Sequence, residues 1–324
     1  MRYKLSAPAT LHTTIQLPAS KSISNRALIL HALAQGHIAP SNLSDCDDTR
    51  VMIKALDGNP GHIDILAAGT AMRFLTAYLS VTPGTRIITG TERMQQRPIR
   101  ILVDALRELG AQIEYAGKEG FPPLRITGTE LTGEEISLAG NVSSQYISAL
   151  LMIGPILKNG LRLNLTGEII SRPYINLTLQ LMKEFGADAA WSSESSITVR
   201  PGKYRDIPFT VESDWSGASY WYQMVALIQD NEKKESTKTE IKLPGLLPRS
   251  YQGDSRGAEI FAKLGVHTTY TDQGVILTKM GTPVTCLKED LVDIPDLAQT
   301  FVVTCCLMNI PFRFTGLQSL KIKE

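Results

Sequence analysis

The sequence contains little cysteine and no recognisable nucleotide-binding loop. Its four cysteines are too few and too scattered for a disulfide framework or a CxxC metal site. They are Cys46, Cys286, Cys305 and Cys306, and the last two lie in the apolar run FVVTCCLM, which predicts that both are buried packing residues. The five histidines show neither HxH nor HExxH spacing, so we expect no metal. Neither GxxxxGKS, GxxxxGKT nor GxGxxG occurs, which argues against a P-loop and a dinucleotide-binding fold.

Long apolar stretches and a surplus of one charge are also missing. The longest apolar stretch, residues 146–157, has about 12 residues, well short of the roughly 18 that a membrane helix needs. The N-terminus, MRYKLSAPATLHTT, has no apolar segment behind its first cations, so we expect no secretory signal and a cytoplasmic protein. With 33 Lys and Arg against 32 Asp and Glu, the net charge of +1 argues against a nucleic-acid-binding protein.

What the 324 residues do contain is an internal repeat. Three segments align: LVDALRELGAQIEY (102–115), TLQLMKEFGADAAW (178–191) and GAEIFAKLGVHTTY (257–270). Each predicts an amphipathic helix closed by a glycine, at Gly110, Gly186 and Gly265, and followed by two strands. The three glycines are 76 and 79 residues apart.

A second, small-residue-rich helix followed by a strand alternates with the first. It occurs at residues 22–44, 68–90, 143–167, 216–245 and 296–316. The repeating unit is therefore strand, helix, strand, helix, strand, strand, with an abbreviated copy at 47–66. This predicts an α/β protein in which sheets surround helices. Only four copies of the glycine-closed helix follow five copies of the small-residue helix, so we expect the last copy to be truncated near Glu324.

Several polar residues lie where these helices are expected to begin. Lys21, Ser22 and Arg26 open the first, Gly69 and Thr70 the second, and Ser143, Ser144 and Gln145 the third. The free N–H groups of helix starts bind anions, although caps with solvated cations would explain each segment taken alone. Arg97-Pro98 and Arg172-Pro173 are repeat-related arginines at helix starts, and each could also be a plain exposed arginine. Asp214 and Asp254 are explained by capping, and Asp296 is a cap or a general base.

Eight motifs occur in one order and carry a family resemblance. They are PASKSISNRAL, AGTAMRFLTA, MQQRPIRILVDALRELGA, NVSSQYISALLM, SRPYINLTLQLMKEFGA, QGDSRGAE, DIPDLAQT and LKIKE. The chain closely resembles the 5-enolpyruvylshikimate-3-phosphate (EPSP) synthases, or 3-phosphoshikimate 1-carboxyvinyltransferases, over essentially its whole length. The resemblance implies an inside-out α/β barrel of two domains built from βαβαββ units. Residues 20–213 would form a complete domain, and 1–19 with 214–324 an incomplete second one.

The resemblance also implies an activity. Enzymes of this family transfer the enolpyruvyl group of phosphoenolpyruvate to the 5-hydroxyl of shikimate 3-phosphate and release phosphate, a step of chorismate and aromatic amino acid biosynthesis that glyphosate blocks. They need no cofactor or metal, since one acid, one base and several fixed cations suffice. The partners implied are the two small-molecule substrates, without nucleic acid or membrane, and a monomer is expected.

Site residues carry over from the family by position. Asp296 corresponds to the proton acceptor, Glu324 to the proton donor, and Lys21 to a cation shared by both substrates. Shikimate 3-phosphate would be bound by Lys21, Ser22, Arg26, Ser143, Ser144, Gln145, Ser171, Asp296 and Lys323, in a pocket that Arg172 and Tyr174 line. Phosphoenolpyruvate would be bound by Lys21, Gly69, Arg97 and Gln145.

One residue departs from the family pattern, and two other functions stay open. Ala67 stands where the family commonly has an asparagine, so one polar contact near phosphoenolpyruvate is lost or replaced. A non-catalytic fragment that binds shikimate 3-phosphate is the main alternative. The sister enolpyruvyl transferase acting on UDP-N-acetylglucosamine is less favoured, because MQQRPIR lacks that enzyme's usual cysteine and PASKS replaces its usual start motif.

Overall fold

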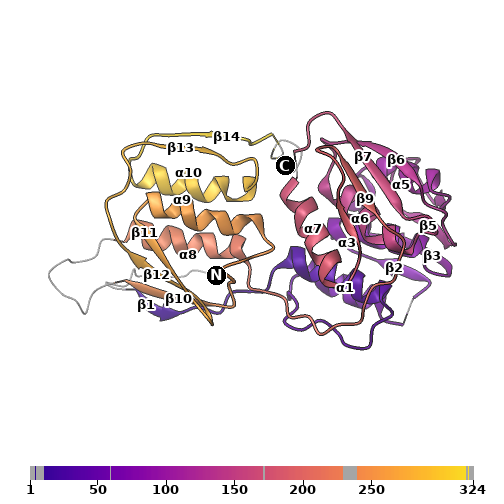
Figure 1. The fold of residues 1–324 in the computed structure, drawn as a ribbon, viewed down its shortest axis with the longest axis horizontal. Helices are drawn as coiled ribbons and strands as arrows, with labels where there is room; N and C mark the ends of the chain where they lie inside the picture. Colours follow the sequence, from indigo (N-terminus) through magenta and orange to yellow (C-terminus); the bar gives the residue numbers. More distant parts are fainter. Residues whose placement is uncertain are drawn as a thin grey trace. The chain divides into compact units, whose positions relative to one another are not determined.

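The chain is built from two compact units. The computed structural model describes residues 4, 11–58, 60–170, 172–228, 239–318 and 320. Unit 1 combines Met1–Pro18 with Glu212–Glu324, and unit 2 is Ala19–Val211 (Figure 1). From the sequence we expect the crossovers next to residues 20 and 213; the units of the structure change at Pro18–Ala19 and Val211–Glu212. None of the described helices is long and apolar enough to span a membrane.

The first full repeat of unit 2 begins after the second helix of the chain. Its elements are β2 (His62–Asp64), α3 (Gly69–Ser80), β3 (Gly84–Thr89), the short α4 (Glu92–Gln95), α5 (Arg100–Glu108), β4 (Gln112–Tyr115) and β5 (Leu124–Gly128). The strands form one sheet in the order β2-β3-β5-β4. Strand β2 pairs with β3 in parallel, and β5 pairs antiparallel with both β3 and β4.

The second full repeat has the same order and the same pairing. It comprises β6 (Glu135–Ala139), α6 (Ser144–Ile153), η1 (Gly154–Ile156), β7 (Leu161–Thr166), α7 (Arg172–Glu184), β8 (Ala189–Trp191) and β9 (Ser196–Val199). Its sheet order, β6-β7-β9-β8, matches that of the first repeat strand for strand. An abbreviated copy precedes both and contains α1 (Lys21–Leu33) and α2 (Asp47–Leu56), with a single bridge between Ser41 and Thr210.

Unit 1 contains one full repeat and half of another. The full repeat is β1 (His12–Thr14), α8 (Trp215–Leu227), β10 (Glu240–Pro244), η3 (Gly253–Arg256), α9 (Gly257–Lys263), β11 (Val266–Thr271) and β12 (Gly274–Lys279), in the sheet order β1-β10-β12-β11. The half repeat is β13 (Leu287–Asp290), η4 (Pro295–Leu297), α10 (Ala298–Leu307) and β14 (Phe312–Thr315), whose two strands are parallel. The repeated α/β fold expected from the sequence is confirmed, although none of the four sheets of the described strands closes into a barrel.

A glycine closes the second helix of every full repeat. Gly110, Gly186 and Gly265 follow α5, α7 and α9 with φ of 102°, 86° and 84°, a conformation that residues with a Cβ rarely adopt. After α5 and α7, the next residue turns back onto the helix: Ala111 N–H donates to Leu106 O, and Ala187 N–H to Met182 O, both at 2.9 Å. The glycine period read from the sequence is thus the period of these turns.

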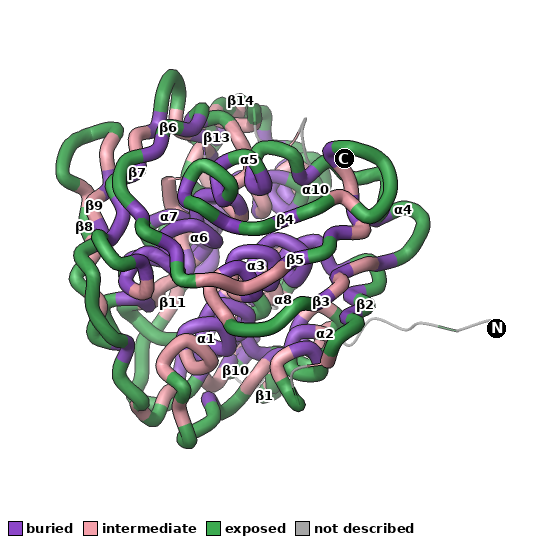
Figure 2. The backbone as a smooth tube through the Cα atoms, turned by 90° about the vertical axis from the view of Figure 1, so that its right-hand side faces the viewer, coloured by how far each residue is buried: buried purple, intermediate pink, exposed green. Residues whose placement is uncertain are grey.

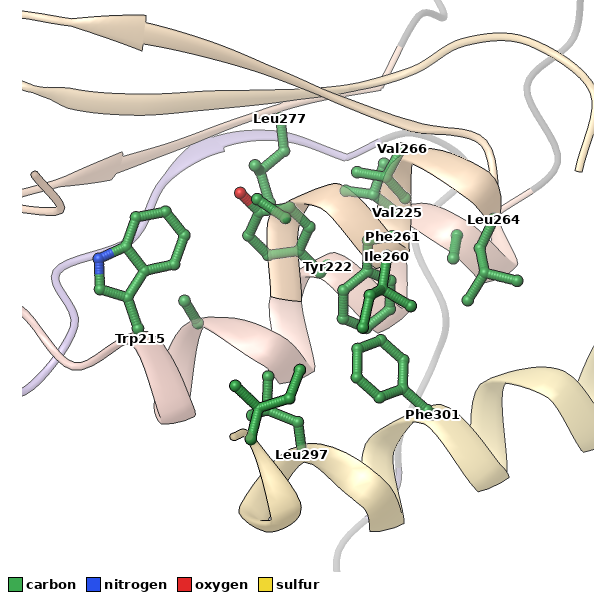
Figure 3. Packing of buried hydrophobic residues seen from close by; sticks show 14 of the residues in the cluster. Trp215, Tyr222, Val225, Ile260, Phe261, Leu264, Val266, Leu277, Leu297 and Phe301 are labelled. Atoms are coloured by element: carbon green, nitrogen blue, oxygen red, sulfur yellow. The ribbon is translucent and has the colours of Figure 1, made fainter. Parts of the chain in front are cut away.

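Helices α8, α9 and α10 enclose an aromatic core in unit 1 (Figure 3). Tyr222 and Phe301 flank Phe261, with ring centroids 5.2 and 4.9 Å apart. In Figure 1 the three helices lie between the four-stranded sheet and the β13–β14 pair. One expectation is wrong here: Cys305 is buried, but Cys306 is exposed. Consecutive helical residues point about 100° apart, so both cannot face the same core.

The core of unit 2 is made by the first helix of each repeat. Helix α3 is buried along nearly its whole length, and so are residues 23–30 of α1 and 146–153 of α6 (Figure 2). Helix α3 packs against α1, α2, α5 and α6 and against β5. Helices covered on all sides are apolar all round, which explains why their sequences are rich in small and aliphatic residues rather than amphipathic.

Gly128 provides a test of how closely the turn after helix α3 approaches strand β5. A Cβ at Gly128, the last residue of β5, would lie 1.8 Å from the carbonyl oxygen of Thr82, which is backbone and cannot swing away. We expect Gly128→Ala to lower the free energy of unfolding by about 2 kcal/mol or more. The measurement is urea unfolding, and the control is Gly61→Ala, where a Cβ would meet nothing within 4 Å. Equal unfolding midpoints for the two variants would contradict this packing.

Candidate active site

The N-terminal turns of α1, α3 and α6 come together in unit 2. Gln145 Nε2, in the first turn of α6, donates to Thr70 Oγ1 in the first turn of α3 at 3.1 Å. One turn further in, Arg26 Nη2 of α1 donates to Ser148 Oγ of α6 at 3.0 Å. Contacts between matching positions mean that the helices run in the same direction. Their free N–H groups and the positive ends of their dipoles therefore lie at the same end of the helix cluster, which suits an anion.

Helix α1 places two of the expected residues at this end. Lys21 is its first residue and is exposed, and Ser22 is half-buried. The N-cap residue, Ser20, is extended and makes no side-chain capping hydrogen bond, so the first N–H groups keep their capacity for a ligand. A lysine beside uncapped N–H groups adds a mobile cation to the helix dipole.

Arg26 is buried, with 3% of its surface exposed. Its Nε donates to Thr178 Oγ1 at 2.7 Å, its Nη1 to Ser22 O at 2.9 Å and its Nη2 to Ser148 Oγ at 3.0 Å. Within the described part of the chain it forms no ion pair with a carboxylate. Burial lowers the pKa of Arg26 to about 10, against a small opposing effect of Tyr174. At neutral pH the guanidinium is therefore a charged group held without a counter-ion.

The expected residues on α3 and before α5 also meet. Arg97 is exposed, yet its Nη1 would lie 2.8 Å from a Cβ built on Gly69. A second guanidinium approaches the same glycine, since Arg73 Nη1 would lie 3.1 Å from that Cβ. A side chain at residue 69 would therefore fill the space beside the two cations. Ala67, one residue before the N-cap of α3, is exposed.

Helix α6 contributes neutral donors and acceptors. Ser143 is its N-cap residue and accepts a long hydrogen bond, 3.4 Å, from the backbone N–H of Gln145. Ser144 and Gln145 open the helix, and all three side chains are half-buried. Because Gln145 is held by Thr70, it lies between the first turns of α3 and α6 and can contact ligands at both.

The remaining expected residues are placed differently. Arg172 at the start of α7 is 4.2 Å from the ring of Trp191 and donates to Glu194 O at 2.5 Å, so it is engaged with the β8–β9 hairpin. Asp296 belongs to unit 1, where it is half-buried on η4. Asp214 caps α8 by accepting from Gly217 N–H at 2.9 Å, as expected, while Asp254 accepts from Ser216 of the same helix. Ser171, Lys323 and Glu324 lie outside the described residues.

Reasoning from the sequence missed Arg73, which is buried in the middle of this site with 4% of its surface exposed. A signal was available. Aligning SISNRAL (22–28) with GTAMRFL (69–75) places Arg26 and Arg73 at the same repeat position. Among the described residues, no cluster of three or more His, Cys, Asp or Glu side chains could hold a metal ion.

Comparison with known proteins gives one consistent result. The family model for EPSP synthase (3-phosphoshikimate 1-carboxyvinyltransferase) matches residues 5–58 and 59–324. A 3-phosphoshikimate 1-carboxyvinyltransferase from Bacteroides fragilis is 72% identical over all 324 residues, which span 77% of its length. The enzyme of the same name from Shewanella pealeana is 36% identical, and the match covers 96% of this chain and 77% of the relative.

Solved structures agree on the fold. An EPSP synthase from Acinetobacter baumannii aligns with a TM-score of 0.61 over 97% of this chain and 94% of that one. Its sequence identity is 17%, so the likeness concerns the fold alone.

Arg26 lends itself to a stability test. Arg26→Met removes a buried charge that has no counter-ion, and Ser148 and Thr178 can still bond each other, since their hydroxyl oxygens are 2.8 Å apart. Because burial depresses the folded-state pKa of Arg26 below its unfolded value, the charge costs stability at every pH below about 10. We expect the urea midpoint of Arg26→Met at pH 7 to be unchanged or higher.

The comparison variant is Thr178→Val, which keeps the charge and removes the acceptor of Nε. It should lose about 1–3 kcal/mol, because a buried donor is then left unsatisfied. An Arg26→Met variant that loses as much as Thr178→Val would show that the guanidinium stabilises the unit.

Proposed function

Because the chain belongs to the EPSP synthase family, we propose that it transfers the carboxyvinyl group of phosphoenolpyruvate to the 5-hydroxyl of shikimate 3-phosphate and releases phosphate. The observation that carries this proposal is the 72% identity, along the whole chain, to the 3-phosphoshikimate 1-carboxyvinyltransferase of Bacteroides fragilis. Such a protein acts in the shikimate pathway. A cytoplasmic location and a monomeric state remain predictions from the sequence.

The charges of the site support the proposal. Both substrates carry a phosphate and a carboxylate, so they need fixed cations that are not already neutralised by the protein. Arg26, Arg73 and Arg97 meet this requirement, since none of them pairs with a carboxylate among the described residues. Lys21 and the uncapped turns of α1 and α3 add donors for phosphate oxygens.

Each substrate has its own set of residues, and Lys21 and Gln145 belong to both. We propose that shikimate 3-phosphate is bound by Lys21, Ser22, Arg26, Ser143, Ser144, Gln145, Ser171, Asp296 and Lys323. Phosphoenolpyruvate is bound by Lys21, Gly69, Arg97 and Gln145. The assignment is supported by the hydrogen bond from Gln145 to Thr70, which joins the first turn of α6 to the first turn of α3.

The chemistry then needs one acid and one base. Asp296 takes the proton of the 5-hydroxyl while the hydroxyl oxygen attacks the second carbon of phosphoenolpyruvate. Glu324 donates a proton to the methylene carbon of phosphoenolpyruvate. The tetrahedral intermediate then loses a proton from the new methyl group and expels phosphate, which regenerates the double bond. The cations stabilise the negative charge that leaves with the phosphate.

Phosphate release by the purified 324-residue chain tests this function. Shikimate 3-phosphate with phosphoenolpyruvate should release phosphate, and UDP-N-acetylglucosamine in place of shikimate 3-phosphate should not. Calorimetry with shikimate 3-phosphate addresses the non-catalytic alternative: binding without any phosphate release would favour a binding protein over an enzyme.

A substitution at Gly69 tests the phosphoenolpyruvate assignment. The Cβ of Gly69→Ala would lie 2.8 Å from Arg97 Nη1, so it displaces that guanidinium and occupies ligand space. We expect the KM for phosphoenolpyruvate to rise about tenfold and inhibition by glyphosate to weaken, while the KM for shikimate 3-phosphate changes little. Gly61→Ala serves as the matched control because its Cβ meets nothing. If Gly69→Ala leaves both the KM for phosphoenolpyruvate and the inhibition by glyphosate unchanged, the phosphoenolpyruvate site lies elsewhere.

A substitution at Asp296 distinguishes a base from a structural residue. Asp296→Asn keeps the size of the side chain but cannot accept a proton, so kcat should fall about 100-fold or more while Tm changes little. Asp293→Asn, an exposed carboxylate three residues earlier, should leave kcat unchanged. If Asp296→Asn lowers Tm sharply and retains turnover, Asp296 is structural.

A further inference from the structure

Two buried arginines occupy the same position of two repeats and make the same local contacts. Arg26 Nη1 donates to Ser22 O at 2.9 Å, and Arg73 Nη1 donates to Gly69 O at 3.0 Å, each four residues back along its own helix. Each guanidinium also lies over an aromatic ring of the next repeat's helix. Arg26 is 5.2 Å from the centroid of Phe74, and Arg73 is 5.8 Å from that of Tyr146.

The two arginines differ in what their remaining nitrogens meet. All three nitrogens of Arg26 donate to protein acceptors, whereas Arg73 Nε is buried and has no hydrogen-bond partner. Burial is the largest influence on Arg73 and lowers its pKa, an effect that Tyr146 and the more weakly acting Asp48 oppose and Arg97 reinforces. Arg73 is therefore a cation with unused donor capacity in a place where leaving it unused is costly.

The guanidinium of Arg73 lies beside one of the proposed ligand sites. Both Arg73 Nη1 and Arg97 Nη1 approach Gly69, at 3.1 and 2.8 Å from the position of a Cβ. Two guanidiniums beside the N-terminus of a helix repel each other and the helix dipole. A dianionic group bound at Gly69 would attract both guanidiniums and the helix N-terminus and so offset these repulsions, which gives a reason for this arrangement.

Arg73 is also linked to the segment that carries Arg97. Its guanidinium lies over the ring of Tyr146, and the hydroxyl of Tyr146 donates to the carbonyl of Pro98 at 2.8 Å. Pro98 directly follows Arg97. On one side the guanidinium of Arg73 thus binds the carbonyl oxygen of Gly69. On the other it supports Arg97 through Tyr146 and Pro98.

We propose that Arg73 is a positioning residue of the phosphoenolpyruvate site, which fixes the carbonyl of Gly69 and the Tyr146–Pro98 contact so that Arg97 and the first turn of α3 meet the anion together. The proposal rests on the function proposed above. It assigns to Arg73 an effect on one substrate: phosphoenolpyruvate binding depends on it, and shikimate 3-phosphate binding, which uses Arg26, does not.

The test compares Arg73→Met, Arg73→Lys and wild type. Arg73→Met removes the charge and its hydrogen bond to Gly69, and we expect the KM for phosphoenolpyruvate to rise about tenfold or more while the KM for shikimate 3-phosphate changes less than about twofold. Arg73→Lys keeps the charge but loses the planar fork, so it should recover only part of the affinity. Calorimetry with phosphoenolpyruvate, in the presence of shikimate 3-phosphate, should show the same order.

Arg86 is the matched control. It is also 4% exposed and also donates to carbonyl groups, those of Thr82, Pro83 and Gly84, but these lie beyond the C-terminal end of α3. Arg86→Met should lower the urea midpoint without separating the two KM values. If Arg73→Met behaves like Arg86→Met, or raises both KM values equally, Arg73 is a structural residue and the proposal is wrong.

Failure of the wider function gives a different result. A wild-type chain that neither releases phosphate nor binds phosphoenolpyruvate with shikimate 3-phosphate present would refute the proposed function, and the assignment of Arg73 with it. A wild-type chain that binds both substrates, beside an Arg73→Met variant with the same two affinities, would refute the assignment of Arg73 alone.

Discussion

The inner helices of unit 2 have almost no solvent-exposed face, and the site follows from this constraint. A polar group on α1, α3 or α6 must find its partner on a neighbouring helix or in a ligand, because water does not reach it. Below the first turn the partners are internal: Arg26 bonds to Thr178 and Ser148. At the first turn the helices end, and the N–H groups of α1 and α3 receive no side-chain cap. The burial that stabilises the unit thereby collects uncapped helix ends and unpaired cations in one place.

The sequence predicted the parts of this arrangement that depend on local chemistry. The glycine period predicted the turns after α5, α7 and α9, because only a residue without a Cβ adopts their positive φ easily. The helix starts were predicted from small residues and serines, and the structure brings Gly69, Arg97 and Gln145 together. Arg73 was missed because a mid-helix arginine usually lies on an exposed face; the repeat alignment with Arg26 could have singled it out, and the structure shows that it is buried. Cys306 was wrongly predicted as buried for the converse reason, since an apolar run does not show which face of α10 is covered.

Buried guanidiniums without carboxylate partners make the free protein less stable and leave its cations available to anionic substrates. A buried carboxylate beside Arg26 or Arg73 would stabilise the free protein and would also compete with anionic substrates for the same cation. Neutral hydroxyls and carbonyls hold the guanidiniums in place without neutralising them. The charge is then compensated only when a ligand binds, so its electrostatic energy contributes to binding rather than to folding.

Helices α1, α3 and α6 are the first helices of three repeats, but at the matching position they carry Arg26, Arg73 and Ser148. A third arginine there would place another cation against Arg26, whereas Ser148 accepts a hydrogen bond from it. This difference is one of those that make the three helix ends unlike one another. Helix α1 keeps an arginine with every nitrogen bonded, and α3 keeps one whose Nε has no partner and whose Nη1 lies beside a glycine. Helix α6 offers serines and an amide that contact both neighbours. Repeats of one topology thus present helix ends of different charge, because the residue at one repeat position helps to decide how much positive charge each helix end carries.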